Sequence, residues 1–329
     1  MASRIPVWLV GYLLLLGVAI AYPLVFTTAY QVNLGIVILF AAYQGSAWNI
    51  LGGFTGLFSF GHAAFFGLGA YTSTLLFIHA GISPWIGMFA GGVIAAAVGI
   101  SFGYLTVRYR LRGHYFALGM FAFAELLRFS AQNLDAIGGS VGILIPFKGN
   151  APEIFQFTDK LPYYFVILGM LVVILAVSRW LKDGRLGYFW ASLRSDDTAA
   201  EMVGVNTLRY KLTAMGLSAF FMALAGTFYA QFYFFIEPQI VFGIDKSLDG
   251  LLRAVIGGLN MVLGPLFGAL LLAPLGELTK ILLPIRNASG VDLLLFGILL
   301  ILAVRFMPRG VLGTLELISG RIVRWRRAA

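Results

Sequence analysis

His62 is a residue that could exchange protons near neutral pH. The chain contains three histidines and no cysteine. His62 stands three positions after Ser59 in a glycine-rich stretch. A proton relay through an imidazole requires carboxylates near it inside the membrane. A packed histidine that hydrogen-bonds to a backbone carbonyl is the simpler interpretation, and both readings stay open here. The lack of cysteine excludes disulfides and thiol chemistry.

Charged residues at two other places could act on a solute. Glu125 and Arg128 stand three apart on one predicted helix face, where they either neutralise each other or line a solute path. Glu277 lies near a predicted span, with Lys280 three residues on. The motifs of zinc proteases, serine hydrolases and phosphate-binding loops do not occur. We therefore expect no enzyme activity, cofactor or metal on this chain.

A polar segment, residues 179–211, interrupts long apolar runs. It holds ten of the 37 charged residues of the chain, which are 23 Lys and Arg and 14 Asp and Glu. Within it we predict a short helix at 192–205. Thr198 with Glu201 fits a capping box, and Asp197 is an alternative N-cap.

Gly204 supplies the left-handed stop that ends this helix. Ala199, Ala200 and Val203 give it a small apolar face, suited to a groove on another protein. A helix lying on the membrane surface is the alternative, although adjacent aspartates suit an anionic bilayer poorly. When a membrane protein places one compact helix between its spans, we expect a partner protein that binds this helix.

Composition places the chain among integral membrane proteins. Its mean hydropathy is +0.90 and only 11% of its residues are charged. Apolar runs of about 20 residues recur, which is the length an α-helix needs to cross a bilayer. We predict a single all-α transmembrane domain over residues 1–329, a bundle of eight to ten spans. The predicted spans are 7–26, 32–51, 56–78, 84–107, 113–131, 161–179, 211–235, 248–263, 264–283 and 290–306.

The basic residues predict the orientation of the bundle. With both termini cytoplasmic, 16 of the 23 lie on the cytoplasmic side, as the positive-inside rule requires. We interpret residues 5–26 as a retained span and not a signal peptide. The basic tail at 321–327 could suggest nucleic acid, but we interpret it as an anchor at anionic headgroups.

Two glycine-rich stretches, 52–70 and 256–269, occupy corresponding places in the two halves of the chain. Because glycine weakens a helix and Pro265 removes a backbone hydrogen bond, broken or re-entrant helices are expected. Paired broken helices point to a transport pathway. Glycines four apart also allow helices to approach closely. The residues predicted to lie at the pathway or at a partner interface are Ser59, Gly61, His62, Glu125, Arg128, Gly257, Gly258 and Asn260.

Several blocks, in the same order along nearly the whole chain, resemble the LivM-type permeases of branched-chain amino acid ABC importers. They are residues 52–71, 112–118, 122–125, 138–143, 199–206, 211, 225–226, 247–248, 257–258 and 264–269. The resemblance implies that the helix at 192–205 is a coupling helix that seats in an ATPase. Its Thr-Ala-Ala-x-x-x-Gly sequence, from Thr198 to Gly204, is a loose form of the family pattern, in which Glu stands where Thr198 stands here.

The same resemblance implies partners and a location. These are a LivH-type permease, two cytoplasmic ATPases that bind ATP and magnesium, and a periplasmic solute-binding protein, in a bacterial inner membrane. The superfamily also carries sugars, urea, amides and aromatic acids, so the solute does not follow from the fold. An ion-coupled secondary transporter and a membrane scaffold without transport are the rival readings. The scarcity of intramembrane charge further predicts that a separate binding protein supplies most of the selectivity.

Overall fold

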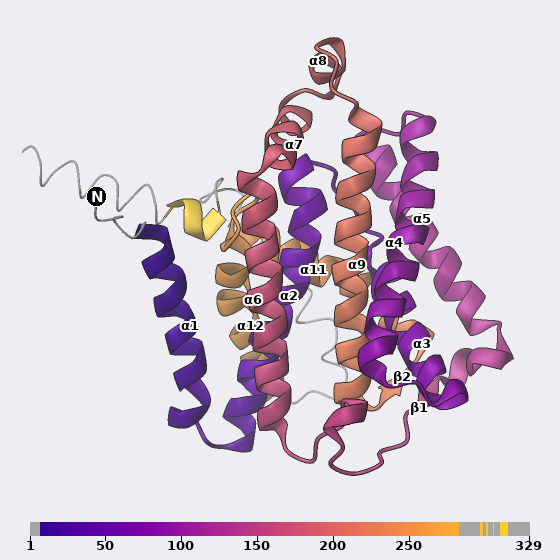
Figure 1. Ribbon diagram of the computed structural model, residues 1–329, viewed down its shortest axis with the longest axis vertical. Helices are drawn as coiled ribbons and strands as arrows, with labels where there is room; N and C mark the ends of the chain where they lie inside the picture. The colour runs from indigo at the N-terminus through magenta and orange to yellow at the C-terminus, as the bar shows by residue number, and fades with distance from the viewer. Residues whose placement is uncertain (1–6, 283–296, 299–300, 302–304, 306–309, 315–329) are drawn as a thin grey trace, which may run out of the picture.

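The computed structural model describes residues 7–282, 297–298, 301, 305 and 310–314. Its longer helices run along the long axis of the molecule (Figure 1). The α-helices are α1 (Val7–Val25), α2 (Ala29–Thr55), α3 (His62–Ala80), α4 (Pro84–Arg108), α5 (His114–Gln132), α6 (Lys160–Asp183), α7 (Arg185–Ser195), α8 (Asp197–Met202), α9 (Thr207–Tyr233), α10 (Pro238–Val241), α11 (Ile244–Gly257) and α12 (Gly264–Leu282). The short elements are η1 (Asp135–Ile137), η2 (Gly139–Val141), η3 (Pro152–Ile154), β1 (Ile143–Leu144) and β2 (Phe235–Ile236).

Five helices in the described part of the chain, α2, α3, α4, α6 and α9, are long and apolar enough to cross a membrane. The helical multi-pass architecture expected from composition is therefore confirmed. Ten spans are not. The expected span at 248–263 is wrong, because α11 ends at Gly257 and its 14 residues rise only about 21 Å. The expected span at 290–306 falls largely outside the described residues, as do the basic tail and the side chain of Lys280.

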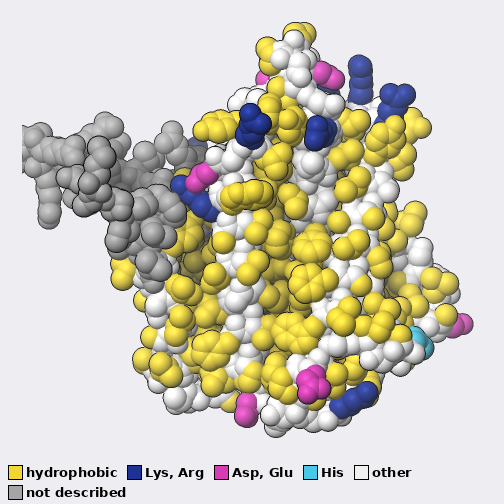
Figure 2. Space-filling view, in the orientation of Figure 1, with side chains coloured by type: hydrophobic (Ala, Val, Ile, Leu, Met, Phe, Trp, Pro, Cys, Tyr) yellow, Lys and Arg dark blue, Asp and Glu magenta, His cyan; other side chains and the backbone are white. Residues whose placement is uncertain are grey.

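The two ends of the bundle differ. α7 and α8 lie at one end, hereafter the α8 end, and the two strands lie at the other, the strand end (Figure 1). β1 pairs antiparallel with β2, with Ile143 opposite Ile236. This pairing joins the loop after α5 to the loop after α9. Figure 2 shows Lys and Arg side chains gathered at the α8 end, above a broad field of hydrophobic side chains.

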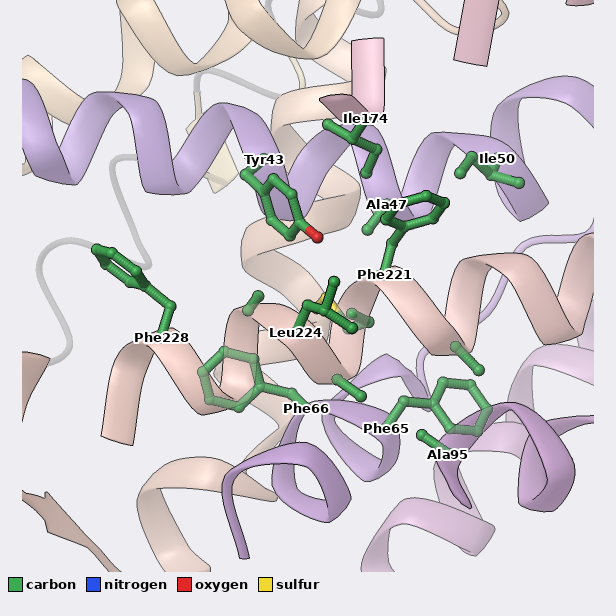
Figure 3. Close-up of a cluster of buried hydrophobic side chains, with 14 of the residues drawn as sticks. Tyr43, Ala47, Ile50, Phe65, Phe66, Ala95, Ile174, Phe221, Leu224 and Phe228 are labelled. Atoms are coloured by element: carbon green, nitrogen blue, oxygen red, sulfur yellow. The ribbon is translucent and has the colours of Figure 1, made fainter. Parts of the chain in front are cut away.

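The core lies where α2, α3, α4, α6 and α9 meet. Figure 3 shows Tyr43 and Ala47 of α2 facing Phe221 and Leu224 of α9, with Phe65 of α3 on the other side of α9. All five side chains are buried. α2 and α9 are therefore the central helices of the bundle, buried on most of their faces.

Glycines let α4 press against both of its neighbours. A Cβ added to Gly87 would lie 2.9 Å from the Cα of Ser73 on α3, and one on Gly99 would lie 3.0 Å from the Cβ of Ala219 on α9. The close approach expected from glycines four residues apart is confirmed at these helices.

Two interruptions of six residues separate α2 from α3 and α11 from α12. The first break, residues 56–61, begins at Gly56, whose φ is +77°. The second break, residues 258–263, contains Gly258 and Asn260, with φ values of +134° and +64°. The expected broken helices are confirmed at both glycine-rich stretches. The expected span at 56–78 accordingly starts as a helix only at His62.

Candidate functional site

The first break ends in a fixed hydrogen-bond network around His62, which is fully buried. The hydroxyl of Ser218 donates to the carbonyl of Ala47 at 2.7 Å, so its oxygen accepts from His62 Nε2–H at 2.8 Å. The hydroxyl of Ser59 accepts from the N–H of Gly61 at 3.2 Å and donates to His62 Nδ1 at 3.1 Å. Both ring nitrogens are therefore occupied. The expected bond from His62 to a backbone carbonyl is wrong, since two serine hydroxyls take its place.

Two consecutive residues of α2 hold the two breaks. The indole N–H of Trp48 donates to the carbonyl of Ser59 in the first break at 2.8 Å. The amide of Asn49 donates to the carbonyl of Met261 in the second break at 3.0 Å, and its oxygen accepts from the N–H of Asn260 at 3.4 Å. α2 is thus a common support for both breaks.

The two halves of the chain also restrain each other at the start of α3. A helix N-terminus leaves N–H groups without partners inside the helix. The N–H of Ala63 donates to the hydroxyl of Ser247 on α11 at 2.8 Å. α11 therefore accepts the hydrogen bond of a free N–H at the start of α3, which follows the first break. α2 in turn hydrogen-bonds to backbone groups of the second break.

The glycines among the predicted residues serve close backbone contact. A Cβ on Gly61 would overlap the carbonyl of Met120 on α5, and a Cβ on Gly257 would overlap the carbonyl of Gly264 on α12. Gly258 has a left-handed φ that residues with a Cβ rarely adopt. These three positions are fixed by packing and backbone geometry.

Glu125 and Arg128 lie away from the two breaks, in the half of α5 nearer the strand end. Arg128 donates to one oxygen of Glu125 from two nitrogens, at 2.6 Å and 2.9 Å, and to Gln239 of α10 at 2.8 Å. The side chain of Arg128 is only 14% exposed and that of Glu125 only 23%. The structure thus unites Ser59, Gly61 and His62 at the first break, and Gly257, Gly258 and Asn260 at the second, and separates this pair from both.

α8 is shorter than the expected helix, and the polar segment holds a second helix, α7. The N-cap is Asp196, whose carboxylate accepts from the N–H groups of Thr198 and Ala199 at 2.8 Å and 3.0 Å. Capping by Thr198 or Asp197 is therefore wrong by one or two positions. Because the helix begins at Asp197, Thr198 and Glu201 both lie inside it, so the capping box of Thr198 with Glu201 does not form. Gly204 does supply the left-handed stop, with a φ of +88°.

The surface of α8 differs in part from expectation. Ala199 is exposed, and Met202 and Val203 are 83% and 80% exposed. Ala200 is buried against this chain, so it does not belong to a face open to a partner. The exposed apolar face, hereafter the α8 face, consists of Ala199, Met202 and Val203.

Three side chains anchor α7 and α8 to the bundle. Lys211 of α9 is buried and pairs with Asp197 of α8. Arg112, in the loop after α4, donates to Thr198 at 3.3 Å. Trp190 of α7 is fully buried and donates to the carbonyl of Tyr210 at 2.9 Å. The α8 face is therefore presented on a firmly held support.

The sequence did not predict the residues that hydrogen-bond to the breaks or beside them, whether from α6 and α7 or from α2. Lys182, in the last turn of α6, donates to the carbonyl of Asn260, and Arg194 of α7 donates to the carbonyl of Gly53 at 3.1 Å. Both stand in the polar segment, so their positive charge was the available signal. Trp48 and Asn49 carried no sequence signal beyond their position just before the glycine-rich stretch.

The described residues contain no group of His, Cys, Asp and Glu able to hold a metal ion. The arrangement combines an exposed apolar face at one end of the bundle, a firmly held support for that face, and two broken helices inside the bundle. It is suited to transmitting movement between these parts.

Comparisons with known proteins agree with this arrangement. The family model described as "Branched-chain amino acid transport system / permease component" matches residues 27–304. The high-affinity branched-chain amino acid transport system permease protein LivM of Escherichia coli K12 is 29% identical over 321 residues, 91% of this chain and 73% of that protein. The corresponding LivH protein of Salmonella typhimurium is 24% identical over 282 residues, 82% of this chain and 90% of that protein. The ribose import permease RbsC of Haemophilus influenzae is 27% identical over 124 residues, 36% of this chain and 38% of that protein. No solved structure matches the chain.

Proposed function

The chain belongs to the family of permease components of branched-chain amino acid transport systems, and we propose that it carries branched-chain or other hydrophobic amino acids across the bacterial inner membrane. It is a transport subunit and not an enzyme. The similarity to LivM over most of both chains supports the choice of solute. A second candidate solute is a sugar or another small polar molecule, which the shorter similarity to a ribose permease favours.

In this proposal residues 1–329 form one permease domain with both termini in the cytoplasm. The α8 end is cytoplasmic, since the basic residues of 179–211 and of the loop after α4 gather there. The chain pairs with a LivH-type permease. Two ATPase subunits bind ATP and magnesium beneath the pair, and a solute-binding protein delivers the amino acid from outside.

One observation carries the assignment of the ATPase contact. The α8 face exposes Met202 and Val203 almost fully at the end of the bundle, and Lys211 holds the helix from below through Asp197. Exposed apolar side chains on a rigid helix suit a groove on another protein. Asp197, Thr198, Ala199, Glu201, Val203 and Gly204 remain the proposed coupling residues, and Ala200 seats α8 on its own chain.

The solute passes beside the two breaks in this proposal. Interrupted helices are where a membrane protein can change shape and expose backbone polar groups. Ser59, His62 and Asn260 lie at these breaks, with the glycines at 61, 257 and 258. Glu125 and Arg128, which satisfy each other, are proposed to stabilise the strand end of α5 and not to bind solute.

Substitution on the α8 face tests the ATPase contact. Val203→Glu places a charge on an 80% exposed position, so it should leave insertion intact, weaken ATPase binding and reduce ATP-driven leucine uptake in vesicles by roughly tenfold or more. Tyr109→Glu, at a 75% exposed position that ends α4 at the same end of the bundle, is the matched control and should transport normally. Pull-down of the ATPases and uptake of labelled leucine are the measurements. Normal binding and uptake by Val203→Glu would contradict the assignment, and ribose competing better than leucine would favour the second solute.

A further inference from the structure

Two basic side chains, one just before α7 and one in its last turn, each reach a different break. Lys182 stands three residues before α7 and donates to the carbonyl of Asn260 in the second break. Arg194, in the last turn of α7, donates to the carbonyl of Gly53, three residues before the first break, at 3.1 Å. The stem of Arg194 also lies against Gly56, where an added Cβ would be 3.3 Å from its Cγ.

These carbonyls lie where helical hydrogen bonding fails. The last carbonyls of a helix have no partner within the helix, and a cation near them is favourable. Gly53 is in the last turn of α2, and Asn260 has a left-handed backbone that takes its carbonyl out of any helix. The two cations therefore bind backbone carbonyls beside or within each break. Partial burial lowers the pKa of the Arg194 guanidinium, so this contact is partly shielded from water.

α7 connects these contacts to α8 with little slack. A single residue, Asp196, joins the two helices; its N–H donates to Ser192 of α7 at 3.1 Å while its carboxylate caps α8. Trp190, buried in α7, stacks against Phe54 of α2 with ring centroids 6.2 Å apart. A displacement of α8 must therefore carry α7 with it.

Each break is consequently held from two sides, by α2 within the bundle and, toward the α8 end, by a cation from the α6–α7 junction or from the last turn of α7. Trp48 and Asn49 form the inner contacts, and Lys182 and Arg194 form the outer ones. A shift of α7 relative to α2 would strain both breaks at once. Two such contacts, one from the last turn of α6 just before α7 and one from the last turn of α7, are more than the capping of a single helix end requires.

We propose that Lys182 and Arg194 are positioning residues that convey movement of the α7–α8 unit to the two breaks, so that both reshape together when the ATPases act. This inference rests on the proposed function, because it takes α8 to be the ATPase contact. It adds which residues carry the motion and where the motion arrives.

The test removes each donor while keeping the length of its stem. Lys182→Met and Arg194→Met, in the complex with the partner permease and both ATPases, should bind the ATPases and hydrolyse ATP normally but lose roughly tenfold in leucine uptake. Arg185→Met removes the same charge from the exposed first residue of α7 and should transport normally. Lys182→Arg and Arg194→Lys keep a donor and should restore a large part of the uptake.

A second readout separates positioning from mere stabilisation. The chain has no cysteine, so single cysteines can be placed at Phe58 in the first break and Leu259 in the second. In the unmodified background, the rate at which a water-soluble thiol reagent labels each cysteine should differ between the ATP-bound and nucleotide-free complex. In Lys182→Met the difference should vanish at Leu259, and in Arg194→Met it should vanish at Phe58.

The outcomes are distinguishable. Met variants that bind the ATPases and keep both uptake and the nucleotide-dependent labelling would overturn the inference and leave the proposed function standing. A background complex whose ATPases bind without α8, or whose labelling ignores nucleotide, would count against the proposed function and the inference together. Should a Met variant fail to fold, Lys182→Leu and Arg194→Leu take its place, since they also remove the donor. Loss of the labelling response with normal folding and ATPase binding supports positioning, and an unchanged response contradicts it.

Discussion

His62 shows how a single side chain can be fully determined by its hydrogen bonds. Ser218 already donates its only proton to a carbonyl, so it can only accept from Nε2–H of the ring. In a neutral imidazole Nδ1 is then the acceptor, and the hydroxyl of Ser59 donates to it. The proton must therefore lie on Nε2, and a proton relay would have to break one of these bonds. The network secures the start of α3 against α2 and α9.

Removing one member of this network should destabilise the protein without altering its surface. Ser218→Ala leaves the Nε2–H of His62 buried without an acceptor, at a cost of about 1–3 kcal/mol. Thermal or denaturant unfolding in detergent measures the change. Ser101→Ala is the control, because its hydroxyl bonds only to Ala97 in the same helix and is exposed. Equal stability of the two variants would refute this network.

At the scale of elements, α11 and α12 pack with backbone against backbone. A Cβ on Gly268 would overlap the carbonyl of Arg253, and one on Gly264 would overlap that of Gly258. Backbone atoms cannot move aside as the end of a side chain can. The second break is therefore tolerable only because its flanking helices carry glycine where they meet.

Alanine at two glycines should give effects of opposite sign. Gly268→Ala should lower stability by about 1–3 kcal/mol or prevent assembly, since the added methyl overpacks a fixed contact. Gly169→Ala, in α6 with nothing within 4 Å of the added Cβ, should raise stability by about 0.5–1 kcal/mol because glycine is a poor helix former. Melting temperatures by fluorescence-detected size exclusion compare the two. A Gly268→Ala variant as stable as Gly169→Ala would show that the α11–α12 contact is looser than described.

The sequence predicted these elements unevenly, for physical reasons. Apolar length located the long helices, and glycine content located both breaks, because each signal is local. The division of the polar segment into α7 and α8 was missed, since Trp190 makes α7 a partly buried helix only through contacts with Phe54 and Tyr210. The burial of Ala200 was missed for the same reason. The predicted pathway residues clustered at the breaks, whereas Glu125 and Arg128 did not, because sequence cannot show which helices an intramembrane charge faces.

At the scale of the whole molecule, the buried and half-buried cations are already engaged. Lys211 pairs with Asp197, Arg253 with Asp249 and Arg128 with Glu125. A groove of about 280 Å³ between α1, α2, α6 and α12 is lined by aliphatic and tyrosine side chains, and none of its described lining residues is charged. An amino acid needs groups that bind its carboxylate and its ammonium, and the described part of this chain offers few that are uncommitted.

The permease should therefore bind its solute weakly by itself. We expect the purified permease pair, without a binding protein, to bind leucine no tighter than roughly millimolar, about −4 kcal/mol. Isothermal titration calorimetry on the pair in nanodiscs measures this, with an Asp249→Asn, Arg253→Met variant as a control for an unnoticed charged site. Micromolar affinity that the double variant abolished would place a true solute site at α11.

The adjacency of Trp48 and Asn49 restricts how this chain can change in evolution. Each residue inserted into a helix rotates everything after it by about 100° and advances it by about 1.5 Å. One insertion in α2 ahead of Trp48 would turn both donors away from Ser59 and Met261 together, so a single change of length would release both breaks. The turn between α1 and α2 does not position either break. Insertions and deletions among relatives should therefore be found in that turn and be absent from the stretch of α2 that leads to Trp48 and Asn49.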